Sequence, residues 1–211
     1  MKIYIVRHAE SKRNARQKSD IDAELTAVGE EQARRLGSYF HDINPNIVYC
    51  STMKRAKTTL EKIRPFLKGI PIKYTSKIVE HNLGIYGKNG EDDWKSYVKD
   101  AGKQGVPFEK FKPEGGESLE EVYERAGKFY NYLLKEHKGK DILLVGHGIF
   151  SLELILYALG LPISEGVYYR LSNASVSTLV LNEKGKVKDF HINDYNQLIK
   201  EALKIRGEIG K

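Results

Sequence analysis

Two continuous apolar segments constrain the fold of this chain more than any other feature of its sequence. The first, KIYIV, occupies positions 2–6, and the second, DILLVGHG, occupies positions 141–148. The second segment in particular reads as a strand that is covered by other residues on both faces. Strands of this kind lie in the middle of a parallel sheet with helices on both sides. The sequence therefore predicts an α/β fold in which these two strands are near the centre.

Helical and extended patterns alternate along the rest of the chain. Further strands are predicted at 46–50 and 70–75, and a terminal hairpin is predicted from 175–182 and 187–193. Helices are predicted at 25–40, 51–67, 118–137 and 149–161, followed by a polar helix at 195–206. This order favours a three-layer α/β/α sandwich, in which a mostly parallel central sheet ends in an antiparallel edge.

Capping signals indicate where several of these helices begin and end. Thr26 is predicted to cap the helix at 25–40, and Ser118 forms a capping box with Glu121, three residues later. Pro65 is expected to end or bend the second helix, because proline cannot donate a helical hydrogen bond. Gly160 is expected to close the apolar helix that follows the second buried strand.

A polar segment at about 84–117 interrupts the alternating pattern. It is rich in glycine, lysine and acidic residues, and we expect one short helix near 91–101. We interpret it as an insertion within a single domain that covers residues 1–211. Its aromatic side chains are expected to form the core of this small lobe, and they are Trp94, Tyr97, Phe108 and Phe111.

Several classes of protein are disfavoured by the composition. No apolar run reaches the roughly 20 residues that a membrane-spanning helix needs. The N-terminus does not resemble a secretory signal, because Arg7 ends the first apolar run after only a few residues. Cys50 is the single cysteine, so it cannot form an intrachain disulfide and is expected to be a buried small residue. We therefore expect a cytoplasmic protein with no membrane partner.

The formal net charge of +7 does not by itself indicate a nucleic-acid partner. The basic residues are mostly lysines mixed with glutamates along the whole chain, and no nucleic-acid recognition motif accompanies them. We expect a mixed, solvated surface and no nucleic-acid binding. A homodimer would be ordinary for such a chain, but the sequence does not fix the oligomeric state.

Charged and polar side chains follow three of the predicted strands at the point where each strand ends. Arg7 and His8 follow the first strand, and His147 comes after the strand at 142–145. Arg55 lies on the first turn of the helix after the strand at 46–50. Because ligands of parallel sheets bind beyond the carboxyl ends of the strands, we expect these side chains to surround one ligand.

A phosphoryl group matches the chemistry of these residues. Guanidinium groups pair geometrically with phosphoryl oxygens, and Asn14 adds an amide donor. A neutral imidazole can attack phosphorus and form a phosphohistidine, and neighbouring arginines disfavour the protonated ring. A carboxylic acid must then protonate the leaving oxygen, and Glu80 in VEHNLG is the best candidate.

The motifs resemble those of the histidine phosphatase superfamily, which is also called the phosphoglycerate mutase-like family. RHAESKRN is similar to the Arg-His-Gly/Ala-Glu signature of this family. Five further blocks follow in the family's order, and they are LTAVGEEQA, STMKRAKTT, VEHNLG, GGES and LLVGHG. Six ordered blocks between residues 3 and 148 make the resemblance specific.

The resemblance implies a role for each matching residue. His8 would be the nucleophile that accepts the phosphoryl group, and Glu80 would protonate the leaving oxygen and later activate water. Arg7, Arg55 and His147 would complete the catalytic set. The groups that would bind the phosphoryl group are Arg7, Asn14, Arg55, His147 and Gly148. The resemblance implies no metal and no cofactor, and an insertion over the active site.

Two reactions within the superfamily remain open, and two other classes of function are less favoured. A phosphomonoesterase would hydrolyse a small phosphorylated metabolite, whereas a 2,3-bisphosphoglycerate-dependent phosphoglycerate mutase would return the phosphoryl group to its substrate. The resembling mutases carry a longer insertion with an arginine pair, and no arginine lies between Glu80 and Arg125 here. We therefore favour the phosphatase. A non-catalytic phospho-ligand-binding relative is disfavoured by the intact site residues, and a nucleic-acid-binding protein is ranked lowest.

Overall fold

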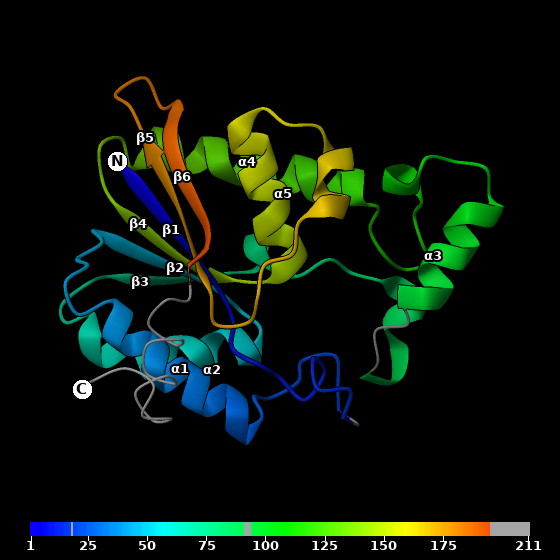
Figure 1. Cartoon of the computed structure of the whole chain (residues 1–211), viewed down its shortest axis with the longest axis horizontal. Coiled ribbons are helices and arrows are strands. Elements are labelled where there is room, and N and C mark those ends of the chain that lie inside the picture. The colour runs from blue at the N-terminus through cyan, green and yellow to red at the C-terminus, as the bar shows by residue number, and fades with distance from the viewer. Residues whose placement is uncertain (18, 91–93, 195–211) are drawn as a thin grey trace, which may run out of the picture.

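A six-stranded sheet with the strand order β3-β2-β4-β1-β5-β6 forms the centre of the computed structural model, which describes residues 1–17, 19–90 and 94–194 (Figure 1). The strands are β1 (Lys2–Arg7), β2 (Ile47–Ser51), β3 (Ile72–Thr75), β4 (Ile142–Gly146), β5 (Val176–Leu181) and β6 (Val187–Asp194). The helices are α1 (Ala27–Tyr39), α2 (Lys54–Ile63), α3 (Trp94–Lys103), α4 (Leu119–Glu136) and α5 (Gly148–Leu159). Short 3₁₀ helices include Gly84–Gly90, Phe108–Lys110 and Ile163–Tyr168.

The sheet is parallel on one side and antiparallel on the other. Strands β3, β2, β4 and β1 pair in parallel, whereas β5 pairs antiparallel with β1, and β6 pairs antiparallel with β5. The predicted mostly parallel sheet with an antiparallel edge is therefore confirmed. The two apolar segments are neighbours at the centre, where Ile3 is paired with Ile142 and Arg7 with Gly146.

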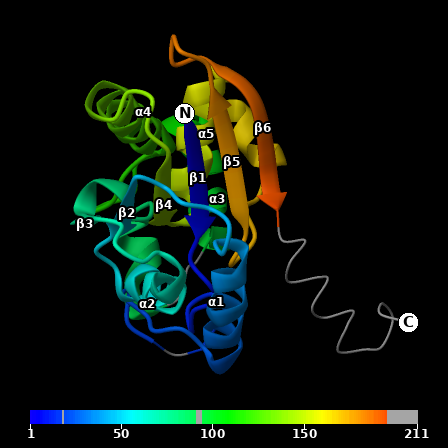
Figure 2. The same ribbon diagram turned by 90° about the vertical axis from the view of Figure 1, so that its left-hand side faces the viewer.

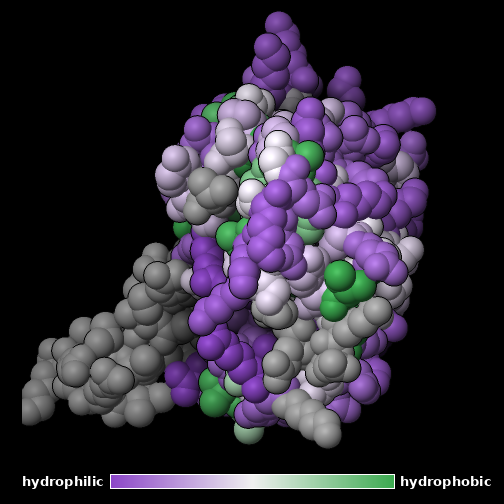
Figure 3. Space-filling model, turned by 90° about the vertical axis from the view of Figure 1, so that its right-hand side faces the viewer, coloured by the Kyte–Doolittle hydropathy of each residue, from purple (hydrophilic) through white to green (hydrophobic). Residues whose placement is uncertain are grey.

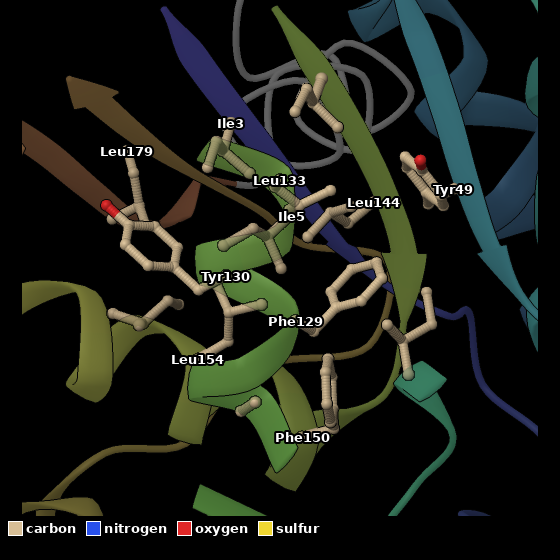
Figure 4. Close-up of a cluster of buried hydrophobic side chains, with 14 of the residues drawn as sticks. Ile3, Ile5, Tyr49, Phe129, Tyr130, Leu133, Leu144, Phe150, Leu154 and Leu179 are labelled. Carbon is tan, nitrogen blue, oxygen red and sulfur yellow. The ribbon is translucent and has the colours of Figure 1, made fainter. Parts of the chain in front are cut away.

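Helices cover both faces of the sheet, as Figures 1 and 2 show. Ile3 and Ile5 of β1 pack in the cluster that includes Phe129 of α4 and Leu154 of α5 (Figure 4). Tyr4 and Val6 alternate with them and pack in a second cluster with residues of α1 and α2. Each face of β1 therefore meets apolar side chains, which explains why the segment does not alternate between apolar and polar residues.

The helix ends follow the predicted signals. The Thr26 side chain caps α1, both hydrogen bonds of the capping box on α4 are present, and Gly160 ends α5 in the left-handed conformation. Helix α2 ends at Ile63, and a 3₁₀ turn that contains Pro65 follows it. The helix predicted at 195–206 lies outside the described residues. No described helix is long and apolar enough to cross a membrane.

The segment at 84–117 forms a small apolar cluster separate from the two that flank the sheet. Tyr97 and Phe111 are buried in this cluster, and Tyr86 and Phe108 pack against it. Helix α3 begins at Trp94, and two 3₁₀ helices accompany it, so the prediction of a single short helix was incomplete. In Figure 1 this segment projects beyond the sheet, and the face seen in Figure 3 is mainly hydrophilic with small separate apolar patches. The aromatic residues thus chiefly hold the segment together.

The start of α1 lies against the loop that follows β1. Thr26 donates its amide hydrogen to the carbonyl oxygen of Glu10 at 3.0 Å, and its hydroxyl donates to the Glu10 carboxylate at 2.7 Å. Gln32, six residues later, accepts the amide hydrogen of Glu10 at 2.9 Å. A Cβ atom on Gly29 would lie only 1.9 Å from the Glu10 carbonyl oxygen, so this approach requires glycine.

We predict that Gly29→Ala destabilises the protein by about 1–3 kcal/mol, because the added methyl group must push the Glu10 peptide away from α1. The free energy of unfolding, measured by urea denaturation, checks this prediction. Gly102→Ala is the matched control. No atom lies within 4 Å of a Cβ at that helical position, so the substitution should be neutral or stabilising by up to about 1 kcal/mol. Equal stability of the two variants would contradict the packing argument.

Candidate active site

The carboxyl ends of the central strands bring His8 and His147 together. His8 follows β1, and its amide hydrogen extends the pairing with β4 by donating to the Gly146 carbonyl oxygen at 2.9 Å. His147 follows β4 directly. The centroids of the two imidazole rings are 5.1 Å apart, and their planes meet at 62°. Both side chains are buried, so two residues that are 139 positions apart line one enclosed site.

The hydrogen bonds of the His8 ring assign its tautomer. Its Nδ1 atom lies 2.7 Å from the Ala9 carbonyl oxygen, which can only accept, so Nδ1 carries the hydrogen. Arg55 donates its Nε hydrogen to His8 Nε2 at 3.1 Å. The Nε2 lone pair therefore accepts from Arg55, and Nε2 is the unprotonated ring nitrogen, which can act as a nucleophile once this hydrogen bond is released.

Arg55 is positioned by α2 and by the loop that precedes α1. Its side chain is buried, and Nη1 donates to the Ile21 carbonyl oxygen at 3.0 Å. Thr59 lies one turn further along α2, where its hydroxyl donates to the Arg55 carbonyl oxygen and accepts the Ala9 amide hydrogen at 3.0 Å. The same face of α2 thus contacts both the ring of His8 and the backbone just after it.

His147 contacts a residue at the end of β2. Its Nε2 atom lies 2.8 Å from the Ser51 hydroxyl, and Ser51 is fully buried. The other ring nitrogen, Nδ1, is buried and has no hydrogen-bond partner among the described residues. A buried nitrogen without a partner is unfavourable, so a polar ligand atom here would stabilise the site.

Arg7 lies against the N-terminal turn of α5. Its guanidinium donates to the Leu171 carbonyl oxygen. A Cβ atom at Gly148 would lie 3.2 Å from Arg7 Nε, so the absence of a side chain at this position allows the guanidinium to approach the helix. Arg7 and Arg55 therefore reach the two histidines from different elements.

Burial and the arginines keep both imidazoles neutral. Burial holds the pKa of His8 well below its ordinary value of 6.5, and the charges of Arg55 and Arg7 lower it further, against a smaller opposing effect of the Ala9 carbonyl. Burial likewise holds the pKa of His147 well below 6.5, with Arg55 and His8 as the next causes. A neutral ring keeps a lone pair, which a nucleophile needs.

Glu80 caps the start of α5 from outside the helix. Its carboxylate oxygens accept the amide hydrogens of Gly148 at 2.9 Å, Ile149 at 3.1 Å and Phe150 at 3.2 Å. The carboxylate therefore lies beside the residue that follows His147. The Gly148 amide, which was predicted to bind a phosphoryl oxygen, donates to Glu80 in this structure.

The segment that carries Glu80 is held by an ion pair between Glu117 and Arg125. Arg125 donates to both carboxylate oxygens of Glu117 at 3.1 Å, and to the Val79 carbonyl oxygen at 3.0 Å. The Glu117 carbonyl oxygen lies 2.7 Å from Nε2 of His81, which is buried. Arg125 is thus engaged within the protein, and it contacts the residue that precedes Glu80.

Asn14 lies at the exposed mouth of the site. Its Oδ1 atom accepts hydrogen bonds from the amide of Ser11 at 3.1 Å, from the Ser11 hydroxyl at 2.9 Å, and from Nδ2 of Asn173 at 3.1 Å. The donors identify this atom as the oxygen. The amide nitrogen of Asn14 therefore faces the other way and is a potential donor to a ligand.

Sequence reasoning missed the contributions of Thr59 and Asn173. Thr59 was part of a recognised motif, but nothing in the sequence revealed that it binds Ala9 across the fold. Asn173 belongs to LSNAS, which comes just before β5. Because β5 is antiparallel to β1, residues that precede β5 lie at the carboxyl end of β1, and this rule could have placed Asn173 near the site. Among the described residues, no three His, Cys, Asp or Glu side chains are grouped as potential metal ligands.

Comparison with known proteins identifies relatives along nearly the whole chain. Residues 3–194 match the sequence model of the histidine phosphatase superfamily, branch 1. A protein of Salmonella paratyphi C that is named a probable phosphoglycerate mutase, GpmB, is 30% identical over 193 residues, which are 87% of this chain and 86% of the relative.

Solved structures share the fold at lower sequence identity. The alpha-ribazole phosphatase of Shigella flexneri superposes with a TM-score of 0.78 and 22% identity, over 92% of this chain and 96% of that one. The phosphoserine phosphatase of Entamoeba histolytica, in complex with 3-phosphoglyceric acid, gives a TM-score of 0.73 and 23% identity, over 93% and 98% of the two chains. A mycobacterial glucosyl-3-phosphoglycerate phosphatase gives 0.76 and 20%, over 92% and 98%.

We predict that His8 and His147 remain neutral at pH 6, where an ordinary imidazole with a pKa of about 6.5 is mostly protonated. Nitrogen NMR of labelled histidine checks this, with His8→Gln and His147→Gln to assign the signals. Because the folded pKa values are lowered, the unfolded chain binds more protons below about pH 7, so acidification reduces the free energy of unfolding. Arg55→Gln should raise the pKa of both rings, because a nearby positive charge is removed. In the unaltered protein, half-protonation of either ring near pH 6.5 would contradict the prediction.

Proposed function

Because this chain belongs to the histidine phosphatase superfamily, we propose that it is a phosphomonoesterase that hydrolyses a small phosphorylated metabolite through a phosphohistidine on His8. The observation that carries this proposal is the arrangement of the His8 ring. Its Nδ1 hydrogen is held by the Ala9 carbonyl, and its Nε2 lone pair faces the guanidinium of Arg55. These two atoms are 3.1 Å apart, so Arg55 can transfer its hydrogen bond from Nε2 to an arriving phosphoryl oxygen, which frees the lone pair for attack.

The first step transfers the phosphoryl group to His8. Its Nε2 lone pair forms the bond to phosphorus while the bond from phosphorus to the ester oxygen breaks. Arg7, Arg55 and the unpartnered nitrogen of His147 bind the phosphoryl oxygens, and the amide nitrogen of Asn14 adds a donor at the mouth. Such fixed donors stabilise the charge of the transition state without reorganising during the reaction.

The leaving oxygen takes its proton from Glu80, which must bind a proton before this step and becomes a carboxylate in it. To donate, Glu80 must turn one carboxyl oxygen away from the amide hydrogens at the start of α5 and toward the ester oxygen. The same movement frees the Gly148 amide, which then binds a phosphoryl oxygen. In the second step Glu80 accepts a proton from water as the water oxygen attacks phosphorus, so that phosphate leaves and neutral His8 is restored.

Phosphoglycerate mutase activity is the second candidate, because the Salmonella relative carries that name. The arginine content of the insertion favours the hydrolase. No arginine lies between Glu80 and Arg125, and Arg125 donates to Glu117 and to two backbone carbonyls. The exposed lysines Lys95 and Lys99 of α3 would attract additional negative charge on a substrate, without the forked geometry of arginine.

A substrate screen separates the two candidates. The protein would be incubated with p-nitrophenyl phosphate, sugar phosphates, nucleotides and 3-phosphoglycerate, and phosphate release would be measured. Isomerisation of 3-phosphoglycerate in the presence of 2,3-bisphosphoglycerate would be followed by phosphorus NMR. We expect phosphate release. Isomerisation that exceeds hydrolysis would favour the mutase, and no turnover of any ester would refute both.

We predict that His8→Ala lowers turnover of p-nitrophenyl phosphate by roughly 1,000-fold or more, because the attacking nitrogen is removed. Covalent phosphate, trapped by alkaline quench and measured by intact mass, should disappear as well. The control is His41→Ala, since His41 is exposed and the hydrogen bond of its side chain in the described structure is to its neighbour Asp42. Phosphoenzyme in the His8 variant would show that another residue is the nucleophile.

We predict that Glu80→Gln slows hydrolysis about 100- to 10,000-fold for alkyl phosphates and much less for p-nitrophenyl phosphate. The alkyl oxygen needs a proton to leave, whereas p-nitrophenolate does not. The measurement is kcat over a series of leaving groups whose acidity differs. Equal slowing across the series would count against proton donation by Glu80 and would point to its contacts with α5 instead.

A further inference from the structure

The segment 171–175 lies against the backbone of the proposed nucleophile. Val176 of β5 is paired with Val6 of β1, and the antiparallel direction leaves the preceding residues beside Arg7 and His8. The Ala174 amide donates to the Arg7 carbonyl oxygen at 3.1 Å and to that of His8 at 3.3 Å. Through these contacts, a part of the chain without a recognised motif touches the main chain of both residues.

Asn173 makes two hydrogen bonds into this region with one atom. Its Nδ2 donates to the His8 carbonyl oxygen at 2.9 Å and to Oδ1 of Asn14 at 3.1 Å. An amide nitrogen carries two hydrogens, so both bonds are satisfied together. Because both partners are acceptors, only the nitrogen of Asn173 can occupy this position.

The bond to Asn14 determines which way the Asn14 amide faces. Its oxygen is held from one side by Ser11 and from the other by Asn173. The Asn14 nitrogen is therefore directed away from both. In the exposed position of Asn14, an amide without these partners would rotate and present either atom to a ligand.

The segment itself is held by several hydrogen bonds to neighbouring elements. The Leu171 carbonyl oxygen accepts from Arg7, and the Ser172 amide and the Ser175 hydroxyl both donate to Oδ1 of Asn193 on β6. Ala174, next to Asn173, is buried with a φ of 55°, a conformation that is unfavourable for a residue with a Cβ atom. Backbone strain of this kind persists where the surrounding contacts determine the conformation, and it is common at functional sites.

We propose that Asn173 is a positioning residue for the reaction, which holds the Asn14 amide nitrogen toward the phosphoryl group and fixes the main chain of His8. This inference rests on the proposed function, since it assigns a purpose to Asn14 in phosphoryl binding. Asn173 is only partly buried, so packing alone does not require its amide to be paired within the protein.

The test compares Asn173→Ala, Asn173→Ser and Asn173→Asp, with Ser172→Ala as the control because no hydrogen bond of the Ser172 side chain is observed in the described structure. Circular dichroism and Tm first establish that each variant folds. KM for p-nitrophenyl phosphate and the inhibition constant of inorganic phosphate should both rise about 5- to 30-fold in Asn173→Ala, with a smaller change in kcat. Of the three variants, Asn173→Asp should bind inorganic phosphate most weakly, because its carboxylate would face two acceptors, the His8 carbonyl oxygen and Oδ1 of Asn14.

A double-variant cycle tests whether Asn173 acts through Asn14. In an Asn14→Ala background, Asn173→Ala should change the phosphate inhibition constant less than about 2-fold. The inference would be overturned if the two changes multiplied fully in their effect on the phosphate inhibition constant. It would also be overturned if folded Asn173 variants kept the wild-type inhibition constant. Neither result would contradict hydrolysis through His8. A wild-type protein that turns over no phosphate ester would instead refute the proposed function.

A measurement that does not depend on activity completes the test. The side-chain amide of Asn14 should be ordered in nitrogen NMR relaxation of the wild-type protein and mobile in Asn173→Ser. If Asn173→Ala is unfolded, KM and the phosphate inhibition constant of the milder Asn173→Ser variant test the positioning role instead. An Asn14 amide that remains equally ordered without Asn173 would contradict the positioning role.

Discussion

The pairing of β1 with β4 is the interaction on which the rest of the site depends. The register pairs Arg7 with Gly146, and the hydrogen bond from the His8 amide to the Gly146 carbonyl continues the pairing one step beyond the strands. Because side chains alternate between the faces of a strand, a shift by one residue would move every apolar residue of β1 to the wrong cluster. The packing of both sheet faces therefore fixes the distance between the rings of His8 and His147.

The same burial that stabilises the sheet sets the chemistry at its edge. The ends of β1 and β4 are covered on both faces, so the two imidazoles that follow them are withdrawn from water and remain neutral. The guanidinium groups of Arg7 and Arg55 reach them from different elements, and each also donates to the carbonyl oxygen of a loop. Neutral nitrogen bases beside two guanidinium cations suit an anion that is attacked by nitrogen, which is the physical core of the proposed reaction.

The sequence predicted what depends on local pattern and on strand ends. The central strands, the capped helices and the residues His8, Arg55 and His147 followed from apolar runs and from the rule that parallel strands present their carboxyl ends at one edge. It did not predict contacts that depend on the final approach of distant segments. One example is the hydrogen bond between the Thr59 hydroxyl and the Ala9 amide, which are 50 positions apart. Another is the capping of α5 by Glu80, which is 68 to 70 positions from Gly148 and Phe150. Such contacts have no period and no spacing, so only the assembled fold reveals them.

The place of β1 in the sheet has a consequence for how the protein is made. Ile3 of β1 is translated 139 residues before Ile142, its partner in β4, and 176 residues before Leu179, its partner in β5. At roughly 5–20 residues per second, an apolar strand waits on the order of 10 s for its first hydrogen-bonding partner. During this interval its edges are open to other nascent chains. Expression of this protein should therefore benefit from chaperones that shield β1, and the candidate active site can form only after His147 has been translated.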